Sequence, residues 1–359
     1  MKIIRNPNID SLRILGMLAI IIHHLLLHGK AMSKYKRFKE LRLLNLLCMW
    51  HVSSFGLISG ITINKTHKFY NLLYLWILVV FYSFFFEIVI NKLNNRPIII
   101  EKFITDLFPV IHNKYWYFTS YFGMFPFLPF IKKSIMLLSL IEIKKIIYFM
   151  IGIFIIWVSY YKDPFSLNGG YSPISLLIFY IFGAYTGKYF FFKKITNRII
   201  IGLICFILFL MVSLITYNIN IKNCFPNMEQ KLKNLFRPSI KSLPTVCQVF
   251  SITIFVSQIK FNNFLSRIIT IIGPLTFDVY LIHENRCIRD NYIKKSFSEI
   301  PNNICYKYIL FLVIKKAFII FIISIFISYL RSIIFRILKV KDFCIICELM
   351  ITKIFGYFN

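Results

Sequence analysis

The chain has 359 residues, of which 58% are hydrophobic and 18% aromatic, and its mean hydropathy is +0.70. The apolar share exceeds the roughly one half that is usual in soluble domains, which excludes an ordinary water-soluble globular protein. The net charge of +29 does not indicate nucleic-acid binding, because the basic residues cluster between apolar segments, as in SKYKRFKELR and FFKKITNR. Such clusters are typical of anchors in lipid headgroups and form no soluble basic face for a phosphate backbone.

Apolar segments of about 20 residues, the length needed to cross roughly 30 Å of hydrocarbon, follow one another along the chain. They predict helices, because a segment in lipid must satisfy its backbone polar groups internally and no alternating barrel pattern is visible. We therefore expect an all-α polytopic membrane bundle of about ten transmembrane helices. The expected spans are residues 10–29, 41–63, 69–91, 115–131, 143–161, 172–192, 199–219, 243–259, 264–284 and 306–330.

The expected spans form a single domain over residues 1–330. The remaining tail, residues 331–359, mixes basic and apolar side chains at helical spacing and is expected to lie along the membrane surface. An even number of spans puts both termini on one side of the bilayer. Basic residues divide almost equally between the two sides, but those on the side of the termini sit in short turns, which favours cytoplasmic termini in a multi-pass protein of the inner (cytoplasmic) cell membrane.

The first span, IDSLRILGMLAIIIHHLLLHG, carries polar groups that are costly inside an apolar helix and usually persist there because they are used. Arg13 and His24 share one helical face about 16 Å apart along the axis, whereas His23 points about 100° away from His24. Arg13 at the cytoplasmic end suits an anionic group such as the phosphates of acyl-coenzyme A, and an imidazole at mid-bilayer can move a proton. The alternative is that Arg13 extends to the headgroups and the histidines bond between helices.

Two acidic residues near the first and ninth spans have structural interpretations. Asp10 precedes Arg13 by one turn and is expected to pair with it or with Arg5. Asp278 lies within an apolar segment, where a buried carboxylate needs a cation or a tyrosine hydroxyl as its partner. A third acidic residue, Glu87, stands alone in the aromatic run FYSFFFEIVI and either orients a histidine or extends from the end of its span.

Five segments in order resemble the integral-membrane acyltransferase 3 family, whose members include O-acetyltransferases of bacterial surface polysaccharides. Arg13 and His24 reproduce the family's arginine, ten intervening residues and histidine. The other four segments are FGLISGITI (55–63), YWYFTSYFGMFPFLPFIKK (115–133), NGGYSPISLLIFYIFGAYTGKY (168–189) and FDVYLIHENRCIRD (277–290). The resemblance extends over residues 10–330.

The resemblance implies a ten-helix bundle that transfers an acyl group, usually acetyl, from cytoplasmic acyl-coenzyme A (acetyl-CoA) to a hydroxyl of a cell-surface or lipid-linked saccharide. It implies that His24 is the catalytic residue, either as general base or as transient acyl carrier, and that Arg13 binds the coenzyme. Many members carry Arg-x-x-Arg before the third helix. This chain has Lys65 and Lys68 there, which keep the spacing and charge but lose the bidentate fork that suits phosphate.

Further candidates belong to the acceptor side. His283 and Glu284 end the ninth span and are expected to bind the acceptor sugar or orient its hydroxyl, the alternative being an ordinary polar helix end. Trp116 belongs to an aromatic cluster that serves either as a stacking platform for a sugar ring or as an interfacial belt.

No metal site or disulfide framework is expected. The eight cysteines are scattered, and the pair Cys344 and Cys347 lacks the second pair of a structural zinc site.

Two other functions remain open from the residues alone. The same intramembrane charges suit a transporter or flippase for a saccharide or lipid-linked intermediate, although internal repeats and paired broken helices are not visible in the sequence. A non-catalytic family member that acts in an assembly is the third possibility, since the basic motif at Lys65 and Lys68 is weakened.

Overall fold

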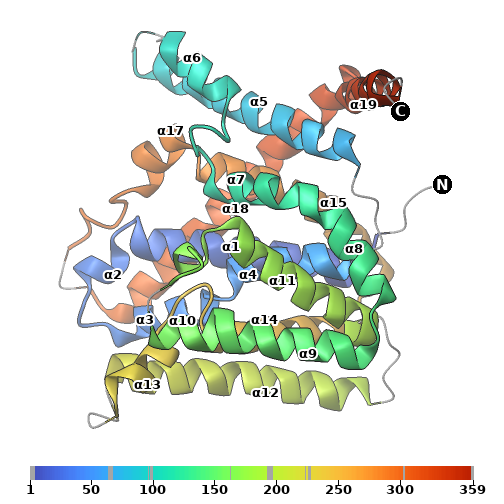
Figure 1. Ribbon diagram of the computed structural model, residues 1–359. Coiled ribbons are helices and arrows are strands. Elements are labelled where there is room, and N and C mark those ends of the chain that lie inside the picture. Colours follow the sequence, from blue (N-terminus) through green and yellow to red (C-terminus); the bar gives the residue numbers. More distant parts are fainter. Residues whose placement is uncertain are drawn as a thin grey trace.

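The computed structural model describes residues 5–63, 68–95, 97, 100–161, 163–191, 197–222, 224, 228–301 and 304–356. Every regular element within these ranges is a helix, and no strand occurs among them. Figure 1 shows long helices packed side by side with roughly parallel or antiparallel axes, with shorter helices at their ends. The expected all-α polytopic bundle is confirmed.

Seven helical segments in the described part of the chain are long and apolar enough to cross a membrane. Two of them join shorter helices, namely α3 (Lys39–Cys48) with α4 (His51–Ile61), and α15 (Asn263–Ile272) with α16 (Thr276–His283). The seven segments are Pro7–Leu27 (α1), Lys39–Ile61, Phe69–Leu93 (α5), Pro173–Phe191 (which contains α11, Pro173–Thr186), Ile199–Lys222 (which contains most of α12, Arg198–Tyr217), Asn263–His283 and Tyr306–Ile337 (α18).

The other three expected spans are shorter or interrupted helices. The segment Leu243–Gln258 (α14) is apolar but shorter. Pro126 lies in a 3₁₀ turn, Phe125–Phe127, that separates α7 (Trp116–Met124) from α8 (Leu128–Leu137), because proline lacks the amide hydrogen that continues an α-helix. The helix α9 (Leu140–Met150) passes through a π-helical segment, Ile151–Trp157, into α10 (Val158–Tyr160).

Helix α1 lies in the middle of the bundle (Figure 1) and contacts α3, α4, α14, α15, α16 and α18. Side chains all around it are buried, including Leu12, Met17, Ile21 and Leu25. A helix that is apolar on every side belongs inside a bundle rather than at its surface. Any polar group on α1 therefore faces another helix or a cavity.

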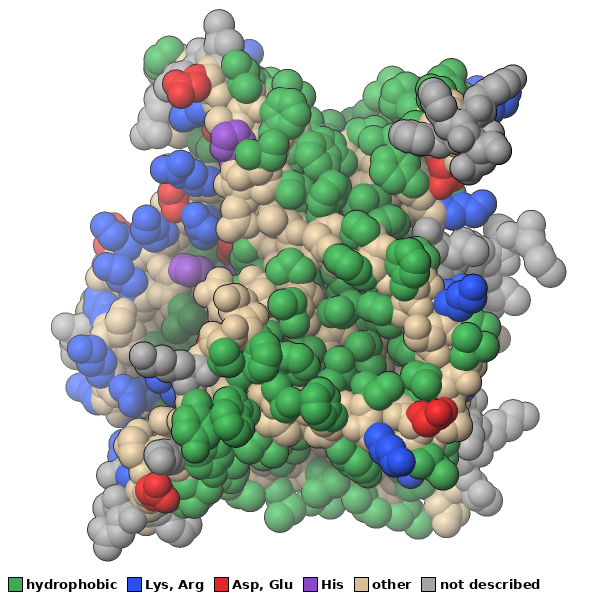
Figure 2. All heavy atoms as spheres, viewed as in Figure 1, with side chains coloured by type: hydrophobic (Ala, Val, Ile, Leu, Met, Phe, Trp, Pro, Cys, Tyr) green, Lys and Arg blue, Asp and Glu red, His purple; other side chains and the backbone are tan. Residues whose placement is uncertain are grey.

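The outer surface of the bundle is apolar. Large side chains of α12 and α18 are exposed, among them Ile199, Leu203, Ile322 and Phe326. Figure 2 shows a broad band of hydrophobic side chains with most lysines and arginines gathered along its edges. This distribution matches a protein whose middle faces hydrocarbon and whose ends face headgroups and water.

Small residues bring α4 and α11 into close contact. Gly56 and Gly60 on α4 form the Gly-x-x-x-Gly spacing that lets membrane helices approach closely, and so do Gly183 on α11 and Gly187 directly after its last residue. A Cβ at Gly60 would lie 1.9 Å from the Tyr180 carbonyl oxygen, and one at Gly183 would lie 1.9 Å from the Leu57 carbonyl oxygen. The backbones therefore touch where a side chain would keep them apart.

The chain's last two helices differ from the expected span and tail. Helix α18 continues past the expected limit of residue 330 to Ile337, so the boundary between domain and tail falls inside a helix. The next helix, α19 (Val340–Gly356), packs against α5. Its Glu348 accepts a hydrogen bond of 2.7 Å from the backbone N–H of Phe69, which satisfies a free donor at the start of α5. That α19 lies along a membrane surface stays a prediction.

We predict that Gly60→Ala lowers the stability of the protein by about 1–3 kcal/mol, because the added methyl group forces α4 and α11 apart. Gly152→Ala is the matched control, since a Cβ there would meet no atom within 4 Å. Thermal unfolding of both variants in detergent micelles tests this. Equal melting temperatures for the two variants would show that the close contact is unimportant.

Candidate active site

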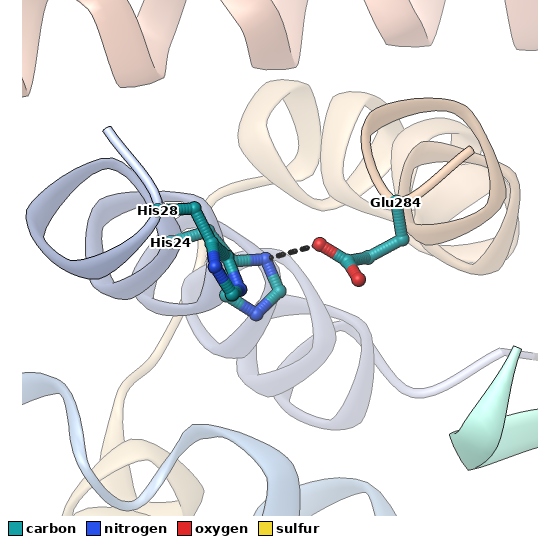
Figure 3. Close-up of side chains that lie close together, drawn as sticks. All are labelled: His24, His28 and Glu284. Carbon is teal, nitrogen blue, oxygen red and sulfur yellow. Dashed lines mark ion pairs between the residues drawn. The ribbon is translucent and has the colours of Figure 1, made fainter. Parts of the chain in front are cut away.

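His24 lies in the last turn of α1 and faces the end of α16 (Figure 3). Its Nδ1 is 2.9 Å from Glu284 Oε1 and 3.2 Å from His283 Nε2. The side chains of His24 and Glu284 are 14% and 9% exposed, and His283 is fully buried. The sequence analysis assigns His24 to catalysis and His283 and Glu284 to the acceptor site. In the structure these three residues lie in one cluster.

The hydrogen bonds of this cluster define which nitrogen of His24 is basic. His283 Nδ1 lies 2.6 Å from the backbone oxygen of Val279. A carbonyl oxygen only accepts, so Nδ1 of His283 carries the hydrogen and Nε2 of the neutral ring is an acceptor. His24 Nδ1 therefore donates, which suits its second neighbour, the Glu284 carboxylate. The remaining nitrogen, His24 Nε2, keeps a free lone pair for a proton.

His23 faces away from His24, as its place on the helix predicts. Its Nδ1 is 2.7 Å from Asn45 Oδ1, and its ring centre is 4.7 Å from that of His51 on α4. His51 is 1% exposed, and neither of its ring nitrogens has a hydrogen-bond partner among the described residues. Sequence reasoning did not single out His51, although a histidine between two apolar stretches was the available signal.

Arg13 lies at the opposite end of α1, in an ionic cluster. Asp10 is 1% exposed and accepts hydrogen bonds from the guanidinium groups of both Arg5 and Arg13. The expected pairing of Asp10 is confirmed with both arginines. A Cβ on Gly273, in the turn between α15 and α16, would lie 2.4 Å from Asp10 Cβ, so this glycine allows the carboxylate to reach the arginines.

A narrow apolar cavity of about 30 Å³ lies along α1 between the level of Arg13 and His24. Its α1 residues are Met17, Ile20 and His24, which follow one another by about one turn. Trp116 forms part of the opposite wall, and its ring packs edge-on against Tyr171 with centres 4.5 Å apart. The structure thus brings Trp116 close to His24. The remaining wall residues are Val52, Phe55, Tyr117, Phe277 and Tyr280.

Two larger polar cavities open near the other end of α1. One, of about 850 Å³, is lined by Glu284 and by residues of α5, α6 (Ile100–Leu107) and the segment 285–294. The other, of about 670 Å³, lies on the His23 side and includes Asn45, Tyr171 and Arg237. The histidine cluster therefore stands between a narrow apolar space and wide polar ones.

The larger cavity also contains Glu87 and Cys287. Glu87 accepts hydrogen bonds from Asn91, Lys102 and Cys287, and does not orient a histidine; Glu284 has that position. Burial and the neighbouring Glu87 carboxylate raise the pKa of the Cys287 thiol to about 12. A thiol with so high a pKa is not a thiolate at neutral pH, so Cys287 is unsuited to be a nucleophile.

The lysine pair that the sequence assigns to coenzyme binding is described only in part. Lys65 lies outside the described residues. Lys68 is exposed and precedes α5, which begins at the same end of the bundle as α1 (Figure 1). The Nζ atoms of Lys68 and of Lys341, a residue of α19, each lie 5.9 Å from the centre of the Tyr70 ring. These two lysines add positive charge to that of Arg13 at this end of the bundle.

A buried ion pair holds α16 against α18. Asp278 is 1% exposed and accepts hydrogen bonds from Arg331 Nε (2.9 Å) and from the Tyr82 hydroxyl (2.9 Å). Both kinds of partner expected for Asp278 are confirmed. The pair lies just over one turn before His283 and thus supports the turn that presents His283 and Glu284 to His24.

We predict that Arg331→Leu lowers the stability by about 3–5 kcal/mol, because it leaves the Asp278 carboxylate buried without its cation. Arg336→Leu on the same helix is the control, since Arg336 is exposed. Thermal unfolding in micelles gives the comparison, and restoring stability by a second change, Asp278→Leu, would attribute the loss to the unpaired charge. An equal, small effect of both single changes would contradict this interpretation.

Comparison with known proteins places this architecture in a family. The family model described as "Acyltransferase domain" matches residues 6–337, which is nearly the whole chain. No curated protein and no solved structure gives a significant match. The matched region contains α1, α16 and α18 and therefore the whole histidine cluster. The chain belongs to the integral-membrane acyltransferase 3 family, and it is a multi-pass membrane acyltransferase.

Proposed function

We propose that the protein is an O-acyltransferase that moves an acyl group, most simply acetyl, from cytoplasmic acyl-coenzyme A to a hydroxyl of a cell-surface or lipid-linked saccharide. The observation that carries the proposal is the position of His24, whose Nδ1 faces Glu284 and His283 while its Nε2 keeps a free lone pair. A base of this kind between a narrow apolar cavity and wide polar cavities suits transfer between two substrates of different polarity.

In the proposed reaction His24 acts as general base toward the acceptor. Its Nε2 takes the hydroxyl proton while the oxygen attacks the thioester carbonyl carbon; the carbon–sulfur bond then breaks, and the proton passes to the leaving thiolate. The nearby Glu284 carboxylate stabilises the imidazolium that forms in between. A transient acyl-histidine is the alternative path, and it uses the same nitrogen.

The donor is proposed to enter from the end of the bundle where α1 begins. Arg13 is held by Asp10, and with Lys65 and Lys68 it supplies positive charge for the coenzyme phosphates. The thin pantetheine arm would follow the apolar cavity toward His24. Because that cavity is only about 30 Å³, we expect its aromatic side chains to turn aside when the arm binds. This arrangement corresponds to cytoplasmic termini in the inner cell membrane.

The acceptor is proposed to enter from the opposite, polar side. The cavity of about 850 Å³ that Glu284 lines is wide and polar enough for a saccharide. Trp116, which lines a cavity together with His24, and Tyr171, which packs against Trp116, add aromatic faces on which a sugar ring can stack. His283 and Glu284 would then contribute through His24 as well as by contact with the acceptor.

The second candidate function is a transporter or flippase for a saccharide or lipid-linked intermediate. The polar cavities near one end of α1 favour it, since a transported solute needs such a space. The acyltransferase family argues for the enzyme. Release of free coenzyme A that depends on the acceptor would occur only with the enzyme.

We predict that His24→Ala abolishes acylation of the cell-surface glycan, whereas His23→Ala leaves much of it. The reason is that His23 faces Asn45 and His51 rather than Glu284. Mass spectrometry of the glycan from a deletion strain that carries each variant measures the acyl groups. Similar losses from both variants would contradict the assignment of the base to one face of α1.

We predict that Arg13→Gln weakens binding of coenzyme A to the purified protein by at least about tenfold, through loss of a charge-assisted hydrogen bond to phosphate. Asp10 keeps Arg5 as its partner, so the variant is expected to fold. Lys39→Gln is the control, because it removes the same charge from an exposed position at the start of α3, the opposite end of the bundle. Binding of radiolabelled coenzyme A to the two variants tests this prediction. Equal weakening by both changes would mean that only the net charge of the protein matters, not the position of Arg13.

A further inference from the structure

The histidine cluster has the composition of a metal site. His24, His28 and Glu284 each offer one ligand atom, and these atoms lie within 4.8 Å of one another (Figure 3). His24 and His28 are four residues apart and so share one face of α1, and Glu284 approaches from the end of α16. This is the one group of three such side chains in the part of the chain that the structure describes.

The distances suit a small divalent cation. Zn²⁺ binds imidazole nitrogen and carboxylate oxygen at about 2.0–2.2 Å, so neighbouring ligand atoms of a tetrahedral site lie about 3.3 Å apart. The separation of His24 Nδ1 from Glu284 Oε1 is 2.9 Å, and the third atom lies within 4.8 Å of both. Side-chain rotations that move the ligand atoms by about an ångström would bring all three to ligand distance.

A further nitrogen lies next to these three ligands. His283 Nε2 is 3.2 Å from His24 Nδ1, and its other ring nitrogen is bonded to the Val279 carbonyl. A second nitrogen held by a backbone carbonyl is typical of histidines that bind metals, because it fixes the tautomer and the ring orientation. Two or three imidazoles with one carboxylate are ligands that Zn²⁺ accepts readily.

The cluster is open to ions from water. His28 is exposed, and Glu284 lines the polar cavity of about 850 Å³. Arg289 lies 3.4 Å from the other carboxylate oxygen, Glu284 Oε2, so its positive charge opposes a bound cation. Oε1, the oxygen nearer His24, faces the histidines, with His24 Nδ1 2.9 Å away. A cation between the two atoms would take the place of this contact.

We propose that His24, His28 and Glu284 bind one divalent transition-metal ion, with Zn²⁺ as the best match, and that the bound ion inhibits the enzyme. The inhibition rests on the proposed function, because the ion takes the carboxylate from His24. Binding through Nδ1 also requires the ring hydrogen to move from Nδ1 to Nε2, the nitrogen that acts as base. Binding itself does not depend on any activity. The sequence alone predicted no metal site, since His28 and Glu284 lie in segments far apart in the chain.

The test begins with binding of Zn²⁺ to the full-length protein in detergent micelles after treatment with a chelator. Competition with a chromophoric chelator is expected to show one Zn²⁺ per chain. His28→Ala is expected to weaken this binding at least about tenfold, whereas His112→Ala, an exposed histidine of the same polar cavity, leaves it unchanged. Absence of stoichiometric binding, or equal affinity of the wild type and the His28→Ala variant, would overturn the proposal.

Two further measurements separate the parts of the proposal. X-ray absorption of the zinc-loaded protein is expected to show nitrogen and oxygen ligands without sulfur; a sulfur signal would assign the ion to the cysteines and overturn the site. In an acyl-transfer assay Zn²⁺ is expected to inhibit the wild type reversibly. The His28→Ala variant is expected to need a higher Zn²⁺ concentration for the same fractional inhibition, with the rate of each form expressed relative to its own zinc-free rate. Transfer that persists in the zinc-loaded wild type would overturn the inhibition. No transfer by any form would instead contradict the proposed function and leave the binding result intact.

Discussion

The contact of His24 with Glu284 and His283 joins the end of α1 to the end of α16, across 259 residues of chain in the case of His283. It determines the orientation and tautomer of the His24 ring, on which the proposed chemistry depends. The contact requires that both helices be held in place. Asp10 packs against Gly273 at the other end of α1, and Asp278 joins α16 to Arg331 of α18. The polar cluster is thus positioned by ion pairs buried elsewhere in an apolar bundle.

These ion pairs also distinguish structural from functional charges. A charge among apolar helices is tolerated where a partner offsets the loss of hydration. Asp10 has two arginines, and Asp278 has Arg331 and a tyrosine hydroxyl. The histidines around His24 are different, because they have one carboxylate beside them, Glu284, and otherwise face one another and cavities. In the proposed function this group acts on substrates that enter from the apolar and the polar side, and in the further proposal the same side chains bind a metal ion.

The sequence predicted the fold well where lipid imposes a simple rule, because the length of an apolar segment follows from bilayer thickness. The sequence was less informative about where helices break or end, because packing between helices determines those positions. Pro126 interrupts one expected span, and α18 continues through Arg331, which the sequence assigned to the tail. The site was predicted in part: helical geometry separates His24 from His23, but the carboxylate partner of His24 is Glu284, a contact between distant segments that no local pattern reveals. The role of Lys65 stays a prediction, since that residue lies outside the described part of the chain.

The central claim is that a thioester is delivered along α1 to His24. The most direct test is an experimental structure of the protein bound to a ketone analogue of acetyl-coenzyme A, in which a methylene group replaces the sulfur and transfer cannot occur. The account predicts phosphates beside Arg13 and the pantetheine arm between Met17 and Trp116. It also predicts that the carbonyl carbon lies within about 4 Å of His24 Nε2, a distance that leaves room for the acceptor oxygen between them. An analogue bound away from α1, or one whose carbonyl group ends far from His24, would contradict it.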